Sequence, residues 1–381
     1  MCDDVDSSAG LADWLHHISD VELCATTSDG FARERGIAQG DKHAASIHDL
    51  AGCISNATTA STVHTLDPSV GDCRPNIDLK SIRAVYKEEV ASTNALDDLV
   101  LCCPLLAEAG KEPLQGGLDG FVLKGLLNKS ECESLIKATE SMGFSFWNPS
   151  SERKDYRNAD TVEVTHQQLA DALWLRVKDE VAAEVTILAD SPRHSKELEG
   201  TWVAVGMNPN MLFNRYFAGG HFSPHTDGYT VLDFNTRSMY SALIYLNDCP
   251  VGGATRMMEE SGDVLGNHVQ EEFVQDEAGR YRFDDARVRA SVSPEAGNAL
   301  FFFQDTLHEG EPVGEGHCKY IIRSDVIYER SPRTFEEPHH QEAYRLFREA
   351  ELTEAENATE ALRLFKLCAR TSPELAAVYG I

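Results

Sequence analysis

In the segment His221-Phe222-Ser223-Pro224-His225-Thr226-Asp227-Gly228, a histidine and an aspartate lie two residues apart. In an extended chain, residues i and i+2 project to the same side, so His225 and Asp227 can face one ligand together. His308 lies much later in the chain, at the end of a different predicted strand. Two imidazoles and a carboxylate on one face of an ion leave its other positions open, an arrangement that suits non-haem Fe(II). We therefore predict that His225, Asp227 and His308 bind one Fe(II) ion.

Two cations follow His308 on one predicted strand. Lys319 and Arg323 are separated by an even number of residues, so both fall on the same face. The neighbouring Ile321 and Ile322 indicate a buried strand, where an unpaired cation is costly. A bound dicarboxylate would pair with such a cation. The alternative is a surface strand that carries both cations, and the apolar neighbours argue against it.

The residues around these motifs show the two-residue period of β-strands. Candidate strands are residues 210–217, 239–247, 253–258, 292–294, 299–303 and 319–327. Many short strands with turn signals and no intervening helices predict a barrel or jelly roll. An insertion at residues 259–290 is rich in acidic residues and arginines, so we expect a surface loop or hairpin there.

Together, these motifs resemble the 2-oxoglutarate/Fe(II)-dependent oxygenase superfamily, in its prolyl 4-hydroxylase-like branch. The matching segments share their order and spacing, and they are residues 214–220, 224–228, 245–255, 294–302 and 308–319. The resemblance runs from about Phe121 to Tyr328, a little more than half of the chain. It implies an α+β fold in which helices pack on a double-stranded β-helix (jelly-roll) core.

The resemblance also implies which residues hold the iron and the cosubstrate. His225, Asp227 and His308 would ligate Fe(II), with no catalytic residue beyond these ligands. The distal carboxylate of 2-oxoglutarate would pair with Lys319, and Arg323 is a close alternative because related enzymes vary in this offset.

Two tyrosines complete the expected cosubstrate site. Tyr216 and Tyr245 match positions whose hydroxyl groups commonly help to hold 2-oxoglutarate; the alternative is that both are core aromatic residues. The implied reaction hydroxylates a protein side chain, with proline as one candidate, or a small molecule. It consumes O2 and decarboxylates 2-oxoglutarate to succinate and CO2, with ascorbate as a candidate additional cofactor.

Three other functions compete with this hypothesis. The first is a catalytically inactive β-helix module that docks partners through its C-terminal helices. The second is a non-redox metal protein of similar shape, which would not need Lys319 or Arg323. The third is nucleic-acid demethylation, which would require a local basic groove that the sequence does not show.

The remaining sequence suggests three regions. Residues 1–95 lack a sustained period and are predicted to be a poorly defined N-terminal extension. Residues 96–330 are predicted to form the dioxygenase domain, with the β-helix core at about 202–330. Residues 331–381 show two helical patterns, at 341–352 and 354–370, and are predicted to be a C-terminal helical pair.

Two helices are expected ahead of the β-helix core. Ser130 is the predicted N-cap of the first, with Glu133 as its capping-box partner and Gly143 at its end. The second is expected over residues 167–183, where leucine and valine residues supply an apolar face.

Charge and cysteine content limit the partners and the compartment. The formal net charge of −28 argues against general binding to nucleic acid or anionic membranes. The sequence contains no run of eighteen apolar residues, so no membrane span is expected, and the acidic N-terminus lacks the features of a secretory signal. Ten scattered cysteines without a Cys-x-x-Cys pair indicate reduced thiols in a cytoplasmic or nuclear protein. The oligomeric state is left open.

Overall fold

The computed structural model describes residues 62–65, 87–90, 96, 110–146, 156–191, 193–258, 273–354 and 356–381. Most of the predicted N-terminal extension and part of the acidic insertion lie outside these ranges. The chain divides into two compact units, and the division falls inside three of its strands, β8 (Gly200–Met207), β12 (Thr236–Tyr245) and β19 (Lys319–Arg330). The first unit comprises residues 1–180, 207–228 and 240–325, and the second comprises residues 181–206, 229–239 and 326–381.

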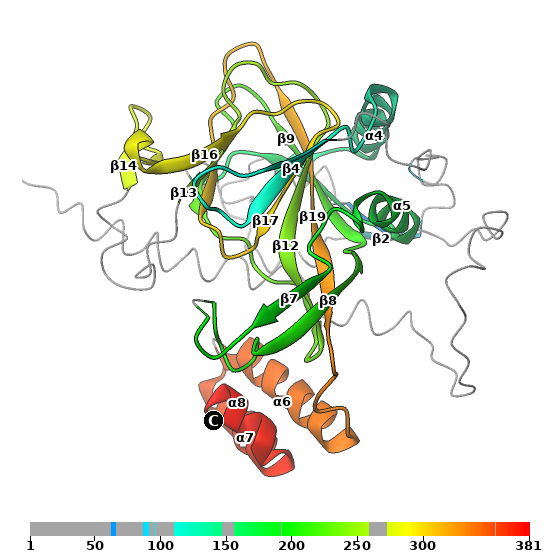
Figure 1. Ribbon diagram of the computed structural model, residues 1–381, viewed down its shortest axis with the longest axis vertical. Coiled ribbons are helices and arrows are strands. Elements are labelled where there is room, and N and C mark those ends of the chain that lie inside the picture. Colours follow the sequence, from blue (N-terminus) through cyan, green and yellow to red (C-terminus); the bar gives the residue numbers. More distant parts are fainter. Residues whose placement is uncertain are drawn as a thin grey trace, which may run out of the picture. The chain divides into compact units, whose positions relative to one another are not determined.

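A large antiparallel sheet forms the main layer of the first unit, and in it β17 lies between β4 and β12 (Figure 1). Its strands follow the order β2-β1-β6-β9-β19-β12-β17-β4-β3. Besides β12 and β19, they are β1 (Thr62–Thr65), β2 (Lys87–Val90), β3 (Gly110–Pro113), β4 (Gly120–Lys124), β6 (Asp160–Thr165), β9 (Asn210–Tyr216) and β17 (Ala299–Phe303); β5 (Ser145–Phe146) pairs with β6. Every side chain of β17 is buried, as expected for an unbroken run of apolar residues.

A second, smaller sheet carries the histidine motifs. Its order is β10 (Phe222–His225), β18 (His308–Gly310), β13 (Thr255–Met258) and β16 (Val288–Val292). Met257 and Ala290 of this sheet share one apolar cluster with Tyr216, Leu243 and Phe302 of the large sheet. The mixed helix and antiparallel sheet confirm the α+β class, whereas the double-stranded β-helix stays a prediction.

Helix α4 (Lys129–Met142) begins at Asn128, so the prediction that Ser130 is its N-cap was wrong. The side chain of Asn128 accepts from the backbone N–H of Glu131, and the Glu131 carboxylate accepts from that of Asn128, both at 2.9 Å. The physical reason is a tertiary contact: Arg176 of helix α5 (Gln167–Val177) pairs with the buried Glu131 at 2.7 Å. Gly143 ends α4 as predicted, with a positive φ of 88°.

The acidic insertion forms a short hairpin where the structure describes it. Strands β14 (Phe273–Gln275) and β15 (Tyr281–Phe283) pair antiparallel, and the 3-10 turn η4 (Asp285–Arg287) leads into β16. The predicted hairpin is thus present, but it is not wholly a surface element, because Phe283 is buried.

The second unit combines short strand pairs with three helices. Strand β7 (Glu184–Ile187) pairs with β8 (Gly200–Met207), and β11 (Val231–Asp233) pairs with β12. Helices α6 (Pro338–Glu354) and α7 (Ala358–Thr371) lie where helical patterns were predicted, and their apolar faces meet in a cluster that includes Leu346 and Leu364. A third helix, α8 (Pro373–Tyr379), was not predicted; Pro373 occupies its first turn behind the N-cap Ser372.

Two further observations concern the described helices and cysteines. Among the described helices, none has the length and apolar character needed to cross a membrane. The described cysteines at positions 132, 249, 318 and 368 are free thiols.

Candidate metal centre

His225 and His308 meet because their strands pair. In the antiparallel ladder between β10 and β18, the two histidines are direct partners. Opposed residues of an antiparallel pair project to the same face of the sheet, so the two imidazoles lie together. Their ring centroids are 4.2 Å apart, and both side chains are buried.

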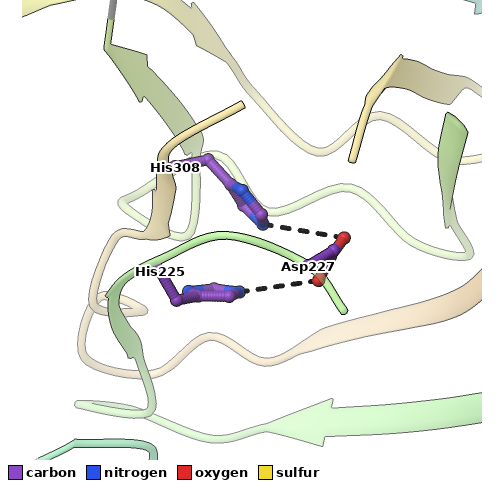
Figure 2. Close-up of side chains that lie close together, drawn as sticks. All are labelled: His225, Asp227 and His308. Atoms are coloured by element: carbon purple, nitrogen blue, oxygen red, sulfur yellow. Dashed lines mark ion pairs between the residues drawn. The ribbon is translucent and has the colours of Figure 1, made fainter. Parts of the chain in front are cut away.

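Asp227 completes the cluster from the loop after β10. Its Oδ1 lies 3.8 Å from Nε2 of His225 and its Oδ2 lies 3.9 Å from Nε2 of His308, so the three side chains point toward one another (Figure 2). All three ligand atoms fall within 4.8 Å of one another. The backbone N–H of Asp227 donates to the carbonyl of Gln304 at 3.1 Å, which anchors the loop.

Backbone carbonyls orient both imidazoles. Nδ1 of His225 lies 2.8 Å from the carbonyl of Ser223, and Nδ1 of His308 lies 2.9 Å from that of Thr306. A carbonyl only accepts hydrogen bonds, so Nδ1 must carry the proton in each ring. The lone pair on each Nε2 then faces the centre of the cluster, as a metal ligand requires.

The protonation states also suit a cation. Burial lowers the pKa of both histidines, and for His225 the charge of His308 adds to this effect. Burial by itself would raise the pKa of Asp227, but the pKa is lowered, and the largest opposing effect is the positive charge of Arg323. Ser241 also lowers this pKa by donating to Oδ2 of Asp227 at 2.5 Å. Two neutral imidazoles and one carboxylate are the groups that bind a divalent transition metal.

Arg323 lies beside the metal ligand and is held by carboxylates. Its Nη2 is 3.8 Å from Oδ1 of Asp227, 3.4 Å from Oδ1 of Asp325, and donates to the carbonyl of Gly228 at 3.3 Å. Gln304 donates to Asp325 at 2.8 Å and to the same Gly228 carbonyl at 3.3 Å. Arg323 therefore belongs to a network around the Asp227 loop.

Lys319 has a different environment. Its side chain is buried, with 4% of the residue exposed, and Nζ donates to the carbonyl of Gly253 at 2.7 Å. In the part of the chain that the structure describes, no carboxylate forms an ion pair with it. Burial lowers the pKa of Lys319 to about 8, against the opposing effects of Cys249 and Glu311. A buried ammonium that forms no ion pair with a carboxylate of the described residues indicates a place for an anionic ligand.

The two predicted tyrosines lie around Lys319. Its Nζ is 5.5 Å from the ring centroid of Tyr216 and 5.6 Å from that of Tyr245. The hydroxyl of Tyr216 is hydrogen-bonded to Arg157, and that of Tyr245 lies 2.9 Å from Oγ1 of Thr255. Both rings belong to the apolar core, while both hydroxyls are engaged in polar contacts.

The site around Lys319 lies next to the cluster of His225, Asp227 and His308. The ring of Phe302 packs edge-on against His308 at 4.7 Å, and Phe302 shares its cluster with Tyr216 and Tyr245. The charge of Lys319 also contributes to the lowered pKa of His308. The geometry can thus hold a divalent metal and, next to it, a ligand with a distal carboxylate.

Several residues of this region were not predicted from the sequence. Arg157 lies far upstream of the motifs; its guanidinium covers the ring of Phe222 at 4.6 Å, and that ring stacks on His225 at 3.5 Å. Ser241 is also absent from any motif. Asp325 did carry a signal, since an acidic residue inside an apolar strand needs a buried partner.

One comparison with known protein families covers the segment that holds these residues. Residues 211–324 match the sequence model of the 2OG-Fe(II) oxygenase superfamily, and this segment contains all seven predicted site residues. No curated protein matches the chain.

Similar solved structures include three enzymes of low sequence identity. A prolyl 4-hydroxylase of Pseudomonas putida is 16% identical over 56% of this chain and 94% of that one, with a TM-score of 0.35. A viral collagen prolyl hydroxylase of Paramecium Bursaria Chlorella virus-1 is 17% identical over 56% and 97%, with a TM-score of 0.33. A non-heme alpha-ketoglutarate-dependent epimerase from nogalamycin biosynthesis is 15% identical over 56% and 78%, with a TM-score of 0.33. The segment that holds the cluster of His225, Asp227 and His308 is thus similar in sequence to the 2OG-Fe(II) oxygenase superfamily, the resemblance that the motifs predicted.

Proposed function

We propose that this protein is a dioxygenase that uses Fe(II), 2-oxoglutarate and O2 to hydroxylate a substrate. The observation that carries the proposal is the pairing of two sites. A buried cluster of two neutral histidines and an ionised aspartate adjoins a buried lysine that has no carboxylate partner among the described residues. A simple structural metal site would not need the second feature.

Each residue has a defined role in this proposal. His225, Asp227 and His308 hold the metal, which supplies the redox chemistry with O2 when it is bound together with the cosubstrate. Lys319 binds the distal carboxylate of 2-oxoglutarate, and the hydroxyls of Tyr216 and Tyr245 help to orient it.

Arg323 is better suited to another role. It already lies within 4 Å of both Asp227 and Asp325, so a third carboxylate would have to compete with them. We therefore propose that Arg323 positions Asp227. In this proposal, Lys319 is the cation that binds the cosubstrate.

The sequence motifs support a proposal for the substrate class. Their likeness to the prolyl 4-hydroxylase-like branch favours a protein side chain, with proline as the first candidate, over a small molecule. The same likeness supports a double-stranded β-helix as the core and residues 96–330 as the catalytic domain.

The test measures decarboxylation of labelled 2-oxoglutarate by the full chain with Fe(II) and ascorbate. The wild type should release labelled succinate, and Asp227→Ala should lose the activity. Lys319→Met should raise the KM for 2-oxoglutarate by about tenfold or more, since a charge-assisted hydrogen bond contributes about 1.5–3 kcal/mol. Arg323→Met should instead weaken metal binding and leave the 2-oxoglutarate KM closer to that of the wild type.

Lys137→Met, which removes an exposed lysine on α4, serves as the matched control and should behave as the wild type. Equal succinate formation by the wild type and Asp227→Ala would show that the cluster is not the iron site. Tight binding of 2-oxoglutarate without any turnover would favour the inactive binding module.

A further inference from the structure

Glu309, the residue after the metal ligand His308, carries a fully buried carboxylate. None of its surface is exposed. Arg282 of the β14–β15 hairpin donates to both of its oxygens, at 3.0 and 3.2 Å, and the backbone N–H of Phe283 donates to it at 2.9 Å. A buried carboxylate that accepts this many hydrogen bonds holds β18 firmly to the β14–β15 hairpin.

The same carboxylate also ties β18 to β13. Arg256 of β13 is the cross-strand partner of Glu309, and its Nε lies 3.3 Å from Oε1. Successive residues of a strand point to opposite faces, so Glu309 projects away from the metal cluster that His308 faces. Its arginine partners therefore act on β18 from the outer side.

Strand β18 depends on such anchors because it is short. It comprises three residues, so its ladders to β10 and β13 contain few backbone hydrogen bonds. Phe283 packs with Met258 and Leu307, which adds an apolar contact just ahead of His308.

The hairpin also reaches the strand of the other histidine. Strand β15 contacts β10, and Arg280 donates to the carbonyl of Gly219, shortly before β10 begins, at 3.3 Å. One element thus braces the segments that present His225 and His308.

We propose that Glu309 is a positioning residue: through Arg256 and Arg282 it locks the outer face of β18 to β13 and the insertion hairpin, and so sets the place of His308 in the metal cluster. This inference rests on the proposed metal site. It assigns to the insertion a role in metal binding, in addition to any contact with substrate.

The test uses Co(II) as the metal probe on the metal-free full chain, with affinity from calorimetry and ligand geometry from the visible absorption spectrum. Glu309→Gln keeps the size of the side chain and removes its charge. Co(II) binding should weaken about tenfold, the lower end of the effect seen when outer partners of metal ligands are removed, and the absorption band should change. Arg282→Gln should act in the same direction, and the double variant should be no worse than Glu309→Gln alone, because the two side chains act as one unit.

Glu277→Gln is the matched control, since it removes an exposed carboxylate from the same hairpin and should leave Co(II) binding unchanged. Circular dichroism identifies any variant that fails to fold. If Glu309→Gln does not fold, the Co(II) affinity and spectrum of Arg282→Gln provide the test. Wild-type affinity and spectrum in both Glu309→Gln and Arg282→Gln would overturn this inference alone. A wild-type chain that binds no Co(II) would overturn the proposed metal site as well.

Discussion

At the residue scale, Lys319 and Arg323 carry the same charge on one strand but have different surroundings. Both side chains lie on one face of β19, on either side of Ile321. Arg323 lies among carboxylates, whereas Lys319 lies among two tyrosine rings and a backbone carbonyl. The cost of burying an ammonium group explains why its pKa falls to about 8.

The pKa of Lys319 predicts how 2-oxoglutarate binding depends on pH. Below about 8 the ammonium is charged and can pair with the distal carboxylate; above it the free protein loses this charge. Binding must then take up a proton, so affinity should fall by up to about tenfold per pH unit as pH rises beyond about 8. Titration calorimetry of 2-oxoglutarate with Mn(II) between pH 6.5 and 9.5 measures this profile.

Lys319→Arg provides the control for this profile. Arginine stays charged across the whole pH range. The different side-chain geometry should change the affinity of the Lys319→Arg variant for 2-oxoglutarate, but this affinity should not fall above pH 8. Identical profiles for the wild type and Lys319→Arg would exclude Lys319 as the titrating group.

At the element scale, tertiary partners choose among locally similar sequences. Asn128 and Ser130 both have a glutamate three residues later, and each can start a helix. Glu131 is the glutamate that Arg176 binds in the interior, and this ion pair favours the start at Asn128. In the same way, pairing of β10 with β18 joins two histidines that are remote in sequence.

The cap of α4 gives a stability prediction. Asn128→Ala should lower the free energy of unfolding by about 1 kcal/mol, because the N–H of Glu131 loses its acceptor. Ser130→Ala should change it by less than about 0.5 kcal/mol, since Ser130 is exposed and lies inside the first turn. Urea unfolding of the three proteins measures the difference, and a larger effect of Ser130→Ala would contradict the observed cap.

At the scale of the whole molecule, the acidic net charge and the histidine cluster affect metal binding in different ways. A net charge of −28 favours solubility, and it also attracts divalent cations without specificity. In the proposed metal site, the histidine nitrogens would favour transition metals, because acidic surfaces offer only oxygen ligands.

Ligand binding should therefore stabilise the whole chain in a selective way. At about 100 times their dissociation constants, Mn(II) and then 2-oxoglutarate should each add about 2.7 kcal/mol to the unfolding free energy and raise the melting temperature. Asp227→Ala should respond to neither ligand, and Lys319→Met should respond to Mn(II) alone. Thermal unfolding measures these shifts, with Ca(II) as the control for general binding to the acidic surface; an equal rise with Ca(II) would contradict a selective site.

The candidate ligands could be predicted from the sequence alone, because their pattern is local. The two-residue spacing of His225 and Asp227 and the even separation of Lys319 and Arg323 can be read from the chain, and so can the short strands around them. The composition of the acidic insertion predicted a surface loop or a hairpin for the same reason, since charge and turn residues act over short distances.

The groups that those side chains contact depend on the tertiary structure. It placed His308 opposite His225, gave Arg323 its two aspartates, left Lys319 without a carboxylate among the described residues, and buried Glu309 between two arginines. These outcomes depend on strand pairing and on the high cost of burying an unpaired charge. Both are set by residues far apart in the chain, so no local pattern could have settled them.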